Sequence, residues 1–250
     1  MTPQQEELCR ALRRAVESAV PEQVVAVAFS GGVDSSLLAR ICKDLGKETT
    51  LVTVGFPGSH DISFSREIAG ELGLAQRVVE LDASGFARDL EHVRDKIACG
   101  NTSHIENCIA YYYIARAARD IGLVLSANGC DELFCGYNGY RTVYDQGEAA
   151  VLRLMDAKIE NELALVQEIS AVAGEFGVQV RQPFLTPEFI RFARAIPLEQ
   201  KIRGADDLVR KHALRQAALE MGVPARAAAK PKKALQYGSL IHKNFKKLER

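Results

Sequence analysis

The segment at residues 24–38, VVAVAFSGGVDSSLL, constrains the fold more than any other part of the chain. It begins with an apolar stretch of strand length, continues through small residues and becomes an amphipathic helix pattern. Two adjacent glycines, Gly31 and Gly32, allow a sharp turn and let the backbone approach a ligand closely. The free amides at the start of the following helix favour an anion. The segment therefore predicts a phosphate-binding loop between a strand and a helix.

The polar side chains of this loop point to a bound phosphate accompanied by a metal ion. Ser30, Ser35 and Ser36 supply hydroxyl donors. Asp34 would repel a bound phosphate unless a divalent cation lay between them, so we interpret Asp34 as a magnesium ligand. No lysine follows the glycines, which distinguishes the loop from G-x-x-x-x-G-K-[ST], and its glycines are not spaced as in G-x-G-x-x-G.

Composition limits the remaining classes. A chain of 250 residues can bury a large core, and we favour one compact unit. Lys plus Arg and Asp plus Glu number 32 each, so no overall charge points to nucleic acid or an anionic membrane. No apolar run approaches the roughly 20 residues of a membrane span, and residues 1–20 are charged and amphipathic, so we expect a cytoplasmic protein. The chain has six cysteines, and none of them are spaced as C-x-x-C. We interpret most of them as small buried residues: Cys9, Cys42, Cys99, Cys108, Cys130 and Cys135.

Apolar strands alternate with helical patterns along the first 147 residues. Further strands are expected at 49–55, 77–81, 123–126 and 178–180, and helices at 3–20, 37–45, 61–72, 103–118, 148–173, 187–195 and 206–221. Ser103 and Glu106 form a predicted capping box at the start of one of these helices. The pattern predicts an α/β fold with a parallel, five-stranded, doubly wound sheet and a helical C-terminal part. Ligands of such sheets bind beyond the carboxyl ends of the strands.

A second motif, SANGCDELFCGY at residues 126–137, follows the fourth strand. A right-handed parallel arrangement places this strand beside the first, so the two loops should face each other. Asp131 would then pair with Asp34 around a magnesium ion beside the bound phosphates, with Glu132 as the neighbouring acid. The alternative is an exposed pair of loop acids.

These motifs resemble those of a known family. The first loop resembles the SGGxDS loop of ATP-pyrophosphatases, and residues 126–137 are similar to the S-G-x-G-x-D-E-L-F-G-G-Y signature of the asparagine synthetase synthase domain and its β-lactam-forming relatives. Residues 181–185 resemble that family's R-x-P-F-L-D, residues 211–215 its K-x-x-L-R and residues 230–235 its R-x-K-x-x-F. The ordered motifs cover about residues 20–240.

The resemblance implies a Rossmann-like fold of the adenine nucleotide alpha hydrolase type, in one domain at 1–250. Residues 1–147 would form the nucleotide-binding core, and residues 148–250 a mainly helical part that completes the site. ATP and Mg²⁺ are the implied cofactors, with Asp34 and Asp131 as metal ligands. Lys232, Asp131 and Glu132 are the implied catalytic residues, and Lys232 would stabilise charge that develops on the phosphates. The ATP and pyrophosphate would contact Ser30, Gly31, Gly32, Asp34, Ser35, Ser36, Val54, Ser126 and Ala127.

The chain departs from the family pattern at several positions. Asn128 stands where asparagine-forming enzymes carry a glutamate, and an amide cannot act as a general base, so aspartate is in doubt as substrate. Thr186 replaces an aspartate and Lys230 an arginine, while Cys130 and Cys135 replace small residues. The phosphate loop begins only at Ser30, so we expect a stand-alone synthase domain without the N-terminal glutaminase domain. Nitrogen would come from ammonia, a separate glutaminase subunit or another nucleophile.

Three functions follow from these motifs. The first is a magnesium-dependent ligase that adenylates a small carboxylic acid for attack by ammonia. The second is an enzyme that modifies or thiolates tRNA, for which the basic stretch Lys230, Lys232, Lys233, Lys243, Lys246, Lys247 and Arg250 could meet phosphates. The third is a non-catalytic nucleotide-binding subunit. The acceptor and the oligomeric state are not encoded in any motif that we identify.

Overall fold

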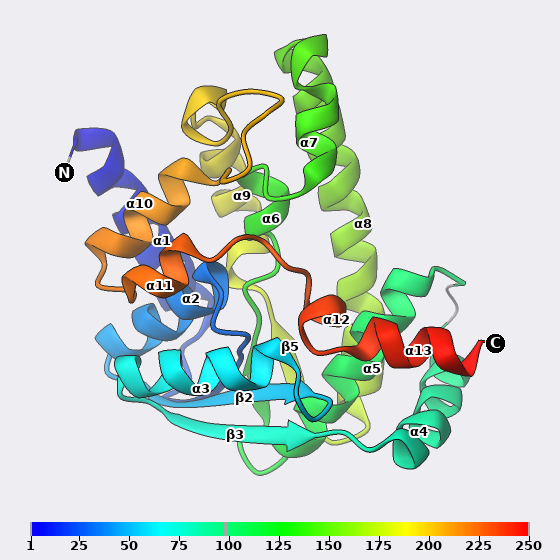
Figure 1. The fold of residues 1–250 in the computed structure, drawn as a ribbon. Coiled ribbons are helices and arrows are strands. Elements are labelled where there is room, and N and C mark those ends of the chain that lie inside the picture. Colours follow the sequence, from blue (N-terminus) through cyan, green and yellow to red (C-terminus); the bar gives the residue numbers. More distant parts are fainter. Residues whose placement is uncertain (1, 98–99, 250) are drawn as a thin grey trace.

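The computed structural model describes residues 2–97 and 100–249, so Met1, Ala98, Cys99 and Arg250 lie outside the described residues. Five parallel strands form one sheet in the order β3-β2-β1-β4-β5 (Figure 1). They span Val24–Ala28 (β1), Glu48–Gly55 (β2), Ala75–Glu80 (β3), Leu123–Leu125 (β4) and Gln179–Arg181 (β5). The predicted parallel, five-stranded sheet is confirmed, as is the pairing of the fourth strand with the first.

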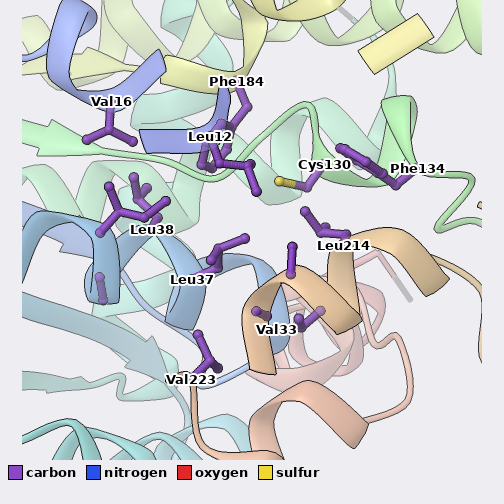
Figure 2. Close-up of a cluster of buried hydrophobic side chains, with 14 of the residues drawn as sticks. Leu12, Val16, Val33, Leu37, Leu38, Cys130, Phe134, Phe184, Leu214 and Val223 are labelled. Carbon is purple, nitrogen blue, oxygen red and sulfur yellow. The ribbon is translucent and has the colours of Figure 1, made fainter. Parts of the chain in front are cut away.

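The strands are apolar on both faces because helices cover both. In β1, Val25 and Val27 point into a first core while Ala26 points into a second core on the opposite face. The first core is packed by α1 (Pro3–Ala19), α2 (Val33–Asp44), α3 (His60–Leu72), α9 (Pro187–Arg194) and α10 (His212–Glu220), and Figure 2 shows part of it. The second core is packed by α4 (Ala83–Lys96), α5 (Thr102–Ala117), α8 (Glu148–Gly174) and α13 (Ile241–Leu248).

Four short helices complete the fold: α6 (Cys130–Leu133), α7 (Asn138–Val143), α11 (Ala225–Ala229) and α12 (Leu235–Gly238). The segment between α11 and α12 carries the chain from the side of the first core to that of the second (Figure 1). The backbone N–H of Phe56 donates to the carbonyl of Ser239 at 2.9 Å, and His242 Nδ1 lies 2.7 Å from the Glu106 carboxylate on α5. These contacts fix the chain that follows α12 against the end of β2 and against α5. No helix in the described ranges is both long and apolar enough to cross a membrane.

Two predicted helix starts were wrong. Helix α5 is capped by Asn101, whose side chain accepts the N–H of Ser103 at 2.9 Å, so Ser103 lies inside the helix and the proposed capping box does not form. The helix expected from residue 206 begins at His212. Asp207 Oδ1 accepts the N–H groups of Val209 and Arg210, each at 3.0 Å, and this local turn replaces the first helical turns. Helices α4, α6, α7, α11, α12 and α13 were not predicted.

Candidate functional site

A cavity lies where the loops after β1 and β4 meet residues 230–236. Its volume is about 250 Å³. Elements far apart in the sequence line it: the loop after β1, helices α5 and α8, the loop after β4 and residues 230–236. Of the predicted nucleotide-binding residues, those that line it are Ser30, Gly32, Asp34, Ser35, Val54, Ser126 and Ala127, together with Asp131, Glu132 and Lys232. Gly31 and Ser36 are not among the lining residues.

The loop after β1 is held by its own hydroxyl groups. The Ser30 N–H donates to Ser35 Oγ at 3.3 Å, and that hydroxyl donates to the Gly32 carbonyl at 3.3 Å. Gly31 has a φ of +71°, and a Cβ there would lie 3.1 Å from the backbone of Ser65, so a side chain would be strained and crowded. Gly32 caps α2 without a side-chain hydrogen bond, which leaves amides at the helix N-terminus for an anion.

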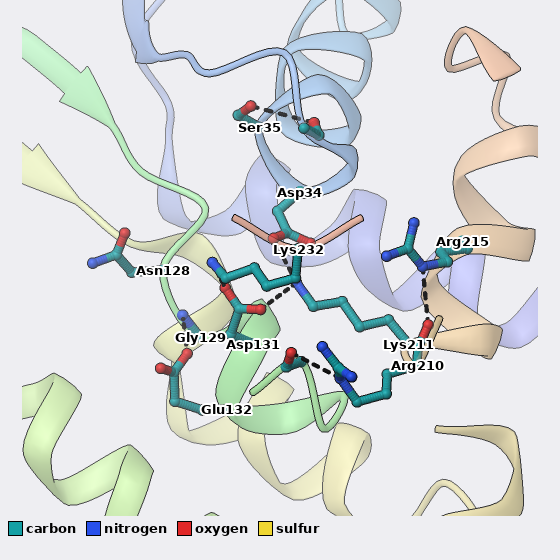
Figure 3. Close-up of polar contacts among 12 residues, drawn as sticks. Asp34, Ser35, Asn128, Gly129, Asp131, Glu132, Arg210, Lys211, Arg215 and Lys232 are labelled. Carbon is teal, nitrogen blue, oxygen red and sulfur yellow. Dashed lines mark hydrogen bonds and ion pairs between the residues drawn. The ribbon is translucent and has the colours of Figure 1, made fainter. Parts of the chain in front are cut away.

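Four charged side chains meet beneath this loop (Figure 3). The Lys211 ammonium lies 2.6 Å from Asp34 Oδ2 and 2.6 Å from Asp131 Oδ1. Lys232 Nζ donates to the other oxygen of Asp131. Burial by itself raises the pKa of Asp131, but the ammonium groups of Lys211 and Lys232 outweigh it and lower the pKa to about 2. Asp131 is therefore a carboxylate throughout the physiological range.

Lys211 was matched to a family motif but not identified as a site residue from the sequence. It is only 1% exposed, and although burial lowers its pKa, the two carboxylates raise the pKa above its usual value. A buried lysine held in its charged form by two acids is a typical feature of functional sites. The K-x-x-L-R match at residues 211–215 was the only signal for it in the sequence.

Glu132 holds the loop in which it lies. Its carboxylate accepts the N–H of Gly129 at 3.0 Å and the hydroxyl of Tyr137 at 2.6 Å. Burial, followed by the charge of Asp131, raises the pKa of Glu132. Both oxygens are thus engaged within the loop, and these bonds hold the turn from which Asp131 projects.

Glu162 on α8 also lines the cavity, and it was not identified as a site residue from the sequence. Glu162 is buried and accepts a hydrogen bond from the Asn128 side-chain amide. Burial and the neighbouring Glu132 raise the pKa of Glu162 to about 8. The hydroxyl of Tyr111 donates to the side-chain oxygen of Asn128 at 3.1 Å, which fixes the orientation of this amide. Glu162 lies in a long charged helix, where its sequence context is that of a solvated residue.

The C-terminal lysines do not form one basic surface. Lys230 Nζ contacts Asp61 Oδ1 at 3.4 Å and the Ser30 carbonyl at 3.1 Å, and Lys232 contacts Asp131, so both lie within the cavity. Lys243, Lys246 and Lys247 are exposed on or beside α13, while Arg250 lies outside the described residues. The basic stretch that suggested a tRNA-binding surface is therefore divided between two environments.

The two cysteines of the acid loop are buried behind the site. Neither Cys130 nor Cys135 lines the cavity. Burial raises the pKa of Cys130 well above its usual value and that of Cys135 to about 12, so both are neutral thiols near pH 7. A neutral thiol is a poor nucleophile. This arrangement gives no support to sulfur transfer, and Cys42 and Cys108 are buried as well, as predicted for most of the cysteines.

The residues present fit a magnesium ion only in part. Asp34 Oδ1 is a buried carboxylate oxygen that receives no hydrogen bond from residues 2–97 or 100–249. Within those ranges no group of three or more His, Cys, Asp and Glu side chains is arranged to hold a metal ion. Magnesium is commonly held by one or two carboxylates together with the phosphates of a substrate. Asp34 and Asp131 match the protein's share of such a site.

Comparison with known proteins gives sequence matches over nearly the whole chain. A profile described as asparagine synthase matches residues 7–168 and 161–249. The chain is 28% identical to asparagine synthetase B (glutamine-hydrolyzing) of Escherichia coli, an alignment covering 91% of this chain and 44% of that protein. A Methanocaldococcus jannaschii sequence, named as a candidate asparagine synthetase (glutamine-hydrolyzing), is 30% identical over 97% of this chain and 52% of its own length. The chain thus spans about half or less of these relatives.

Solved structures give weaker matches. NMN synthetase from Francisella tularensis aligns with a TM-score of 0.40 and 18% identity, covering 78% of this chain and 93% of that chain. A predicted subunit of tRNA methyltransferase from Methanocaldococcus jannaschii aligns with a TM-score of 0.39 and 17% identity, covering 85% and 94%. We draw no functional argument from either.

Proposed function

Because this chain belongs to the asparagine synthase family, we propose that it is an ATP-dependent ligase that forms AMP and pyrophosphate. A carboxylate oxygen of a small acid attacks the α-phosphorus of ATP, and the bond to pyrophosphate breaks. Ammonia then attacks the activated carbonyl carbon, loses a proton and expels AMP. Ammonia comes from solution or from a separate glutaminase subunit.

The observation that carries this proposal is the four-charge cluster beneath the phosphate-binding loop. Lys211 and Lys232 both contact Asp131, and both line the cavity together with Ser30 and Ser35. Ammonium groups fixed in a buried site stabilise negative charge that develops on departing pyrophosphate and on the carbonyl oxygen. Asp34 and Asp131 would hold the magnesium ion, which when bound neutralises phosphate charge. The cluster thus supplies what adenylation requires at the phosphates.

The end of the cavity lined by α8 supports a carboxylic acid as acceptor. Lys158 lies on α8 one helical turn before Glu162, lines the cavity and forms no ion pair with the described part of the chain. Its ammonium lies 5.4 Å from the centre of the Tyr137 ring. An unpaired cation at this end favours an anionic acceptor. Aspartate is one candidate among such acids, because Asn128 occupies the position of the family glutamate.

We propose that Glu162 accepts the proton that ammonia must lose. Its carboxyl group lines the cavity and is oriented by the Asn128 amide. A general base works best when its pKa lies near the operating pH, and the pKa of Glu162 is about 8. Asn128 itself cannot take up a proton, so the base function that the family places at this position would be provided from α8.

The direct test is to incubate the protein with α-phosphate-labelled ATP, magnesium, ammonium and a panel of small carboxylic acids that includes aspartate. We expect AMP, not ADP, to form in response to one class of acid, and an amide of that acid to accumulate with the AMP. If no acid stimulates AMP formation, the ligase proposal is wrong, and a binding-only subunit becomes the better account.

Glu162→Gln should change both the rate and its pH dependence. With rates expressed per free ammonia, the wild-type rate should rise as the pH passes through about 8, and the variant should be about 100-fold slower with a flat profile. The same substitution should also change the pH dependence of stability. Because the pKa of Glu162 in the folded protein is raised from 4.5, the stabilisation from protonated Glu162 is present below about pH 4.5 and lost as the pH rises through about 8. Thermal unfolding at pH 9 should therefore show the variant to be at least as stable as the wild type.

Glu160→Gln provides the matched control, since Glu160 is exposed on the same helix. Its pH profile should follow the wild type. A Glu162→Gln variant that keeps the wild-type profile would show that the proton leaves by another route.

A further inference from the structure

The ammonium of Lys211 occupies the space between the two carboxylates proposed to hold magnesium. It lies 2.6 Å from an oxygen of Asp34 and 2.6 Å from an oxygen of Asp131 (Figure 3). The side chain is 1% exposed, so these carboxylates, and not water, neutralise its charge. Both oxygens of Asp131 are held by ammonium groups, so a cation shared by the two aspartates must displace one of them, and Lys211 is the one that contacts both aspartates.

The fold holds Lys211 in this position. Arg210 and Lys211 have φ values of +51° and +55°, a backbone conformation unfavourable for residues with a side chain. The turn is held by Asp207, which accepts the N–H of Arg210 at 3.0 Å. Gly136 leaves room for the lysine, since a Cβ there would lie 2.3 Å from Lys211 Cε. The turn at residues 210–211 and the absence of a side chain at Gly136 thus both favour this position of Lys211.

The charges of this group sum to zero before any ligand binds. Asp34 and Asp131 contribute two negative charges, and Lys211 and Lys232 contribute two positive charges. In residues 2–97 and 100–249 no third carboxylate joins the two aspartates in a metal-binding group. A divalent cation added alone would carry two uncompensated charges into a buried site beside two ammonium groups.

We propose that Lys211 and a divalent cation are alternative occupants of the space between Asp34 and Asp131. A divalent cation then binds only together with a nucleotide, whose phosphates supply negative charge and accept the displaced ammonium of Lys211. Lys211 thereby prevents the metal from binding in the absence of nucleotide and moves onto the phosphates when both bind. This inference rests on the proposed function only for the identity of the nucleotide.

Manganese provides the probe, because the electron paramagnetic resonance signal of free Mn²⁺ falls when the ion binds. We expect the wild-type protein to leave this signal unchanged without nucleotide and to bind Mn²⁺ together with α,β-methylene-ATP, which is not cleaved at the α-phosphorus. Lys211→Met should bind Mn²⁺ without nucleotide at least about tenfold more tightly than the wild type. Adding Asp34→Asn to that variant should abolish the binding.

Lys232→Met is the matched control, because it removes the same charge but leaves Lys211 between the carboxylates. Its gain in affinity for free Mn²⁺ should be much smaller than that of Lys211→Met, whereas equal gains in the two variants would show that net charge alone matters and would overturn the proposal. If Lys211→Met does not fold, the proposal is tested by thermal unfolding of the wild-type protein with and without Mn²⁺. Mn²⁺ alone should leave its melting temperature unchanged, and a rise that Asp34→Asn removes would contradict the proposal. No acid or ammonia is present, so these results do not depend on ligase activity.

Discussion

Asp131→Asn is expected to abolish the formation of AMP, with a loss of at least about 1,000-fold. The Asp131 carboxylate contacts both Lys211 and Lys232, and a neutral amide of the same shape would leave two ammonium groups with Asp34 as their remaining partner in the cluster. Both lysines would then be misplaced with respect to the phosphates. The labelled-ATP assay measures this loss directly. AMP formation within about tenfold of the wild type would contradict the role given to the cluster.

The same substitution should destabilise the fold. Removing one partner of a buried ion pair costs about 3–5 kcal/mol, because the other charge stays buried without compensation. The pKa of Asp131 is lowered from 3.8 to about 2, so its stabilising contribution is present above about pH 4 and is lost as the pH falls towards 2. Urea unfolding at pH 7 and at pH 3 should therefore show a smaller difference between variant and wild type at pH 3. Asp145→Asn, at an exposed aspartate, should match the wild type in both assays.

Gly136→Ala is expected to reduce activity about 100-fold or more while leaving most of the protein folded. A Cβ at this position would lie 1.9 Å from Asp131 Oδ1 and 2.3 Å from Lys211 Cε. Both contacts are with the outer atoms of side chains, which must shift within a buried site, so the cost in stability should be about 1–3 kcal/mol. Those outer atoms are the functional groups of the site, so their displacement should be felt mainly in catalysis.

Gly139→Ala, three residues along the chain, separates this effect from that of adding a methyl group to the same region. The nearest atom to a Cβ there is Leu154 Cδ2 at 3.7 Å, an ordinary contact, and Gly139 lies within α7. This variant should keep full activity and gain about 0.5–1 kcal/mol in stability. If Gly136→Ala also retains wild-type AMP formation, the close approach of Lys211 to Asp131 is not required for catalysis.

The glycine turn after β1 and the sheet could be predicted because their signals are local. Gly31 needs a positive φ, and β1 needs apolar residues on both faces, and both requirements are visible in a few consecutive letters. Helix starts that depend on a single capping side chain were harder to predict. The start of α5 depends on whether Asn101 or Ser103 caps the helix, and neighbouring residues that can both act as caps do not reveal which one does.

The sequence by itself determined the family, the parallel sheet and the pair of facing acids, Asp34 and Asp131, because short motifs and strand order are encoded along the chain. Only the tertiary structure decided which charges meet those acids. Lys211 is 177 residues from Asp34, and Glu162 lies 34 residues from its partner Asn128. A lysine or glutamate in a polar helix or loop has the same local pattern whether it faces solvent or a buried site. Its charge state and its role are set by burial and by partners that only folding brings within a few ångströms.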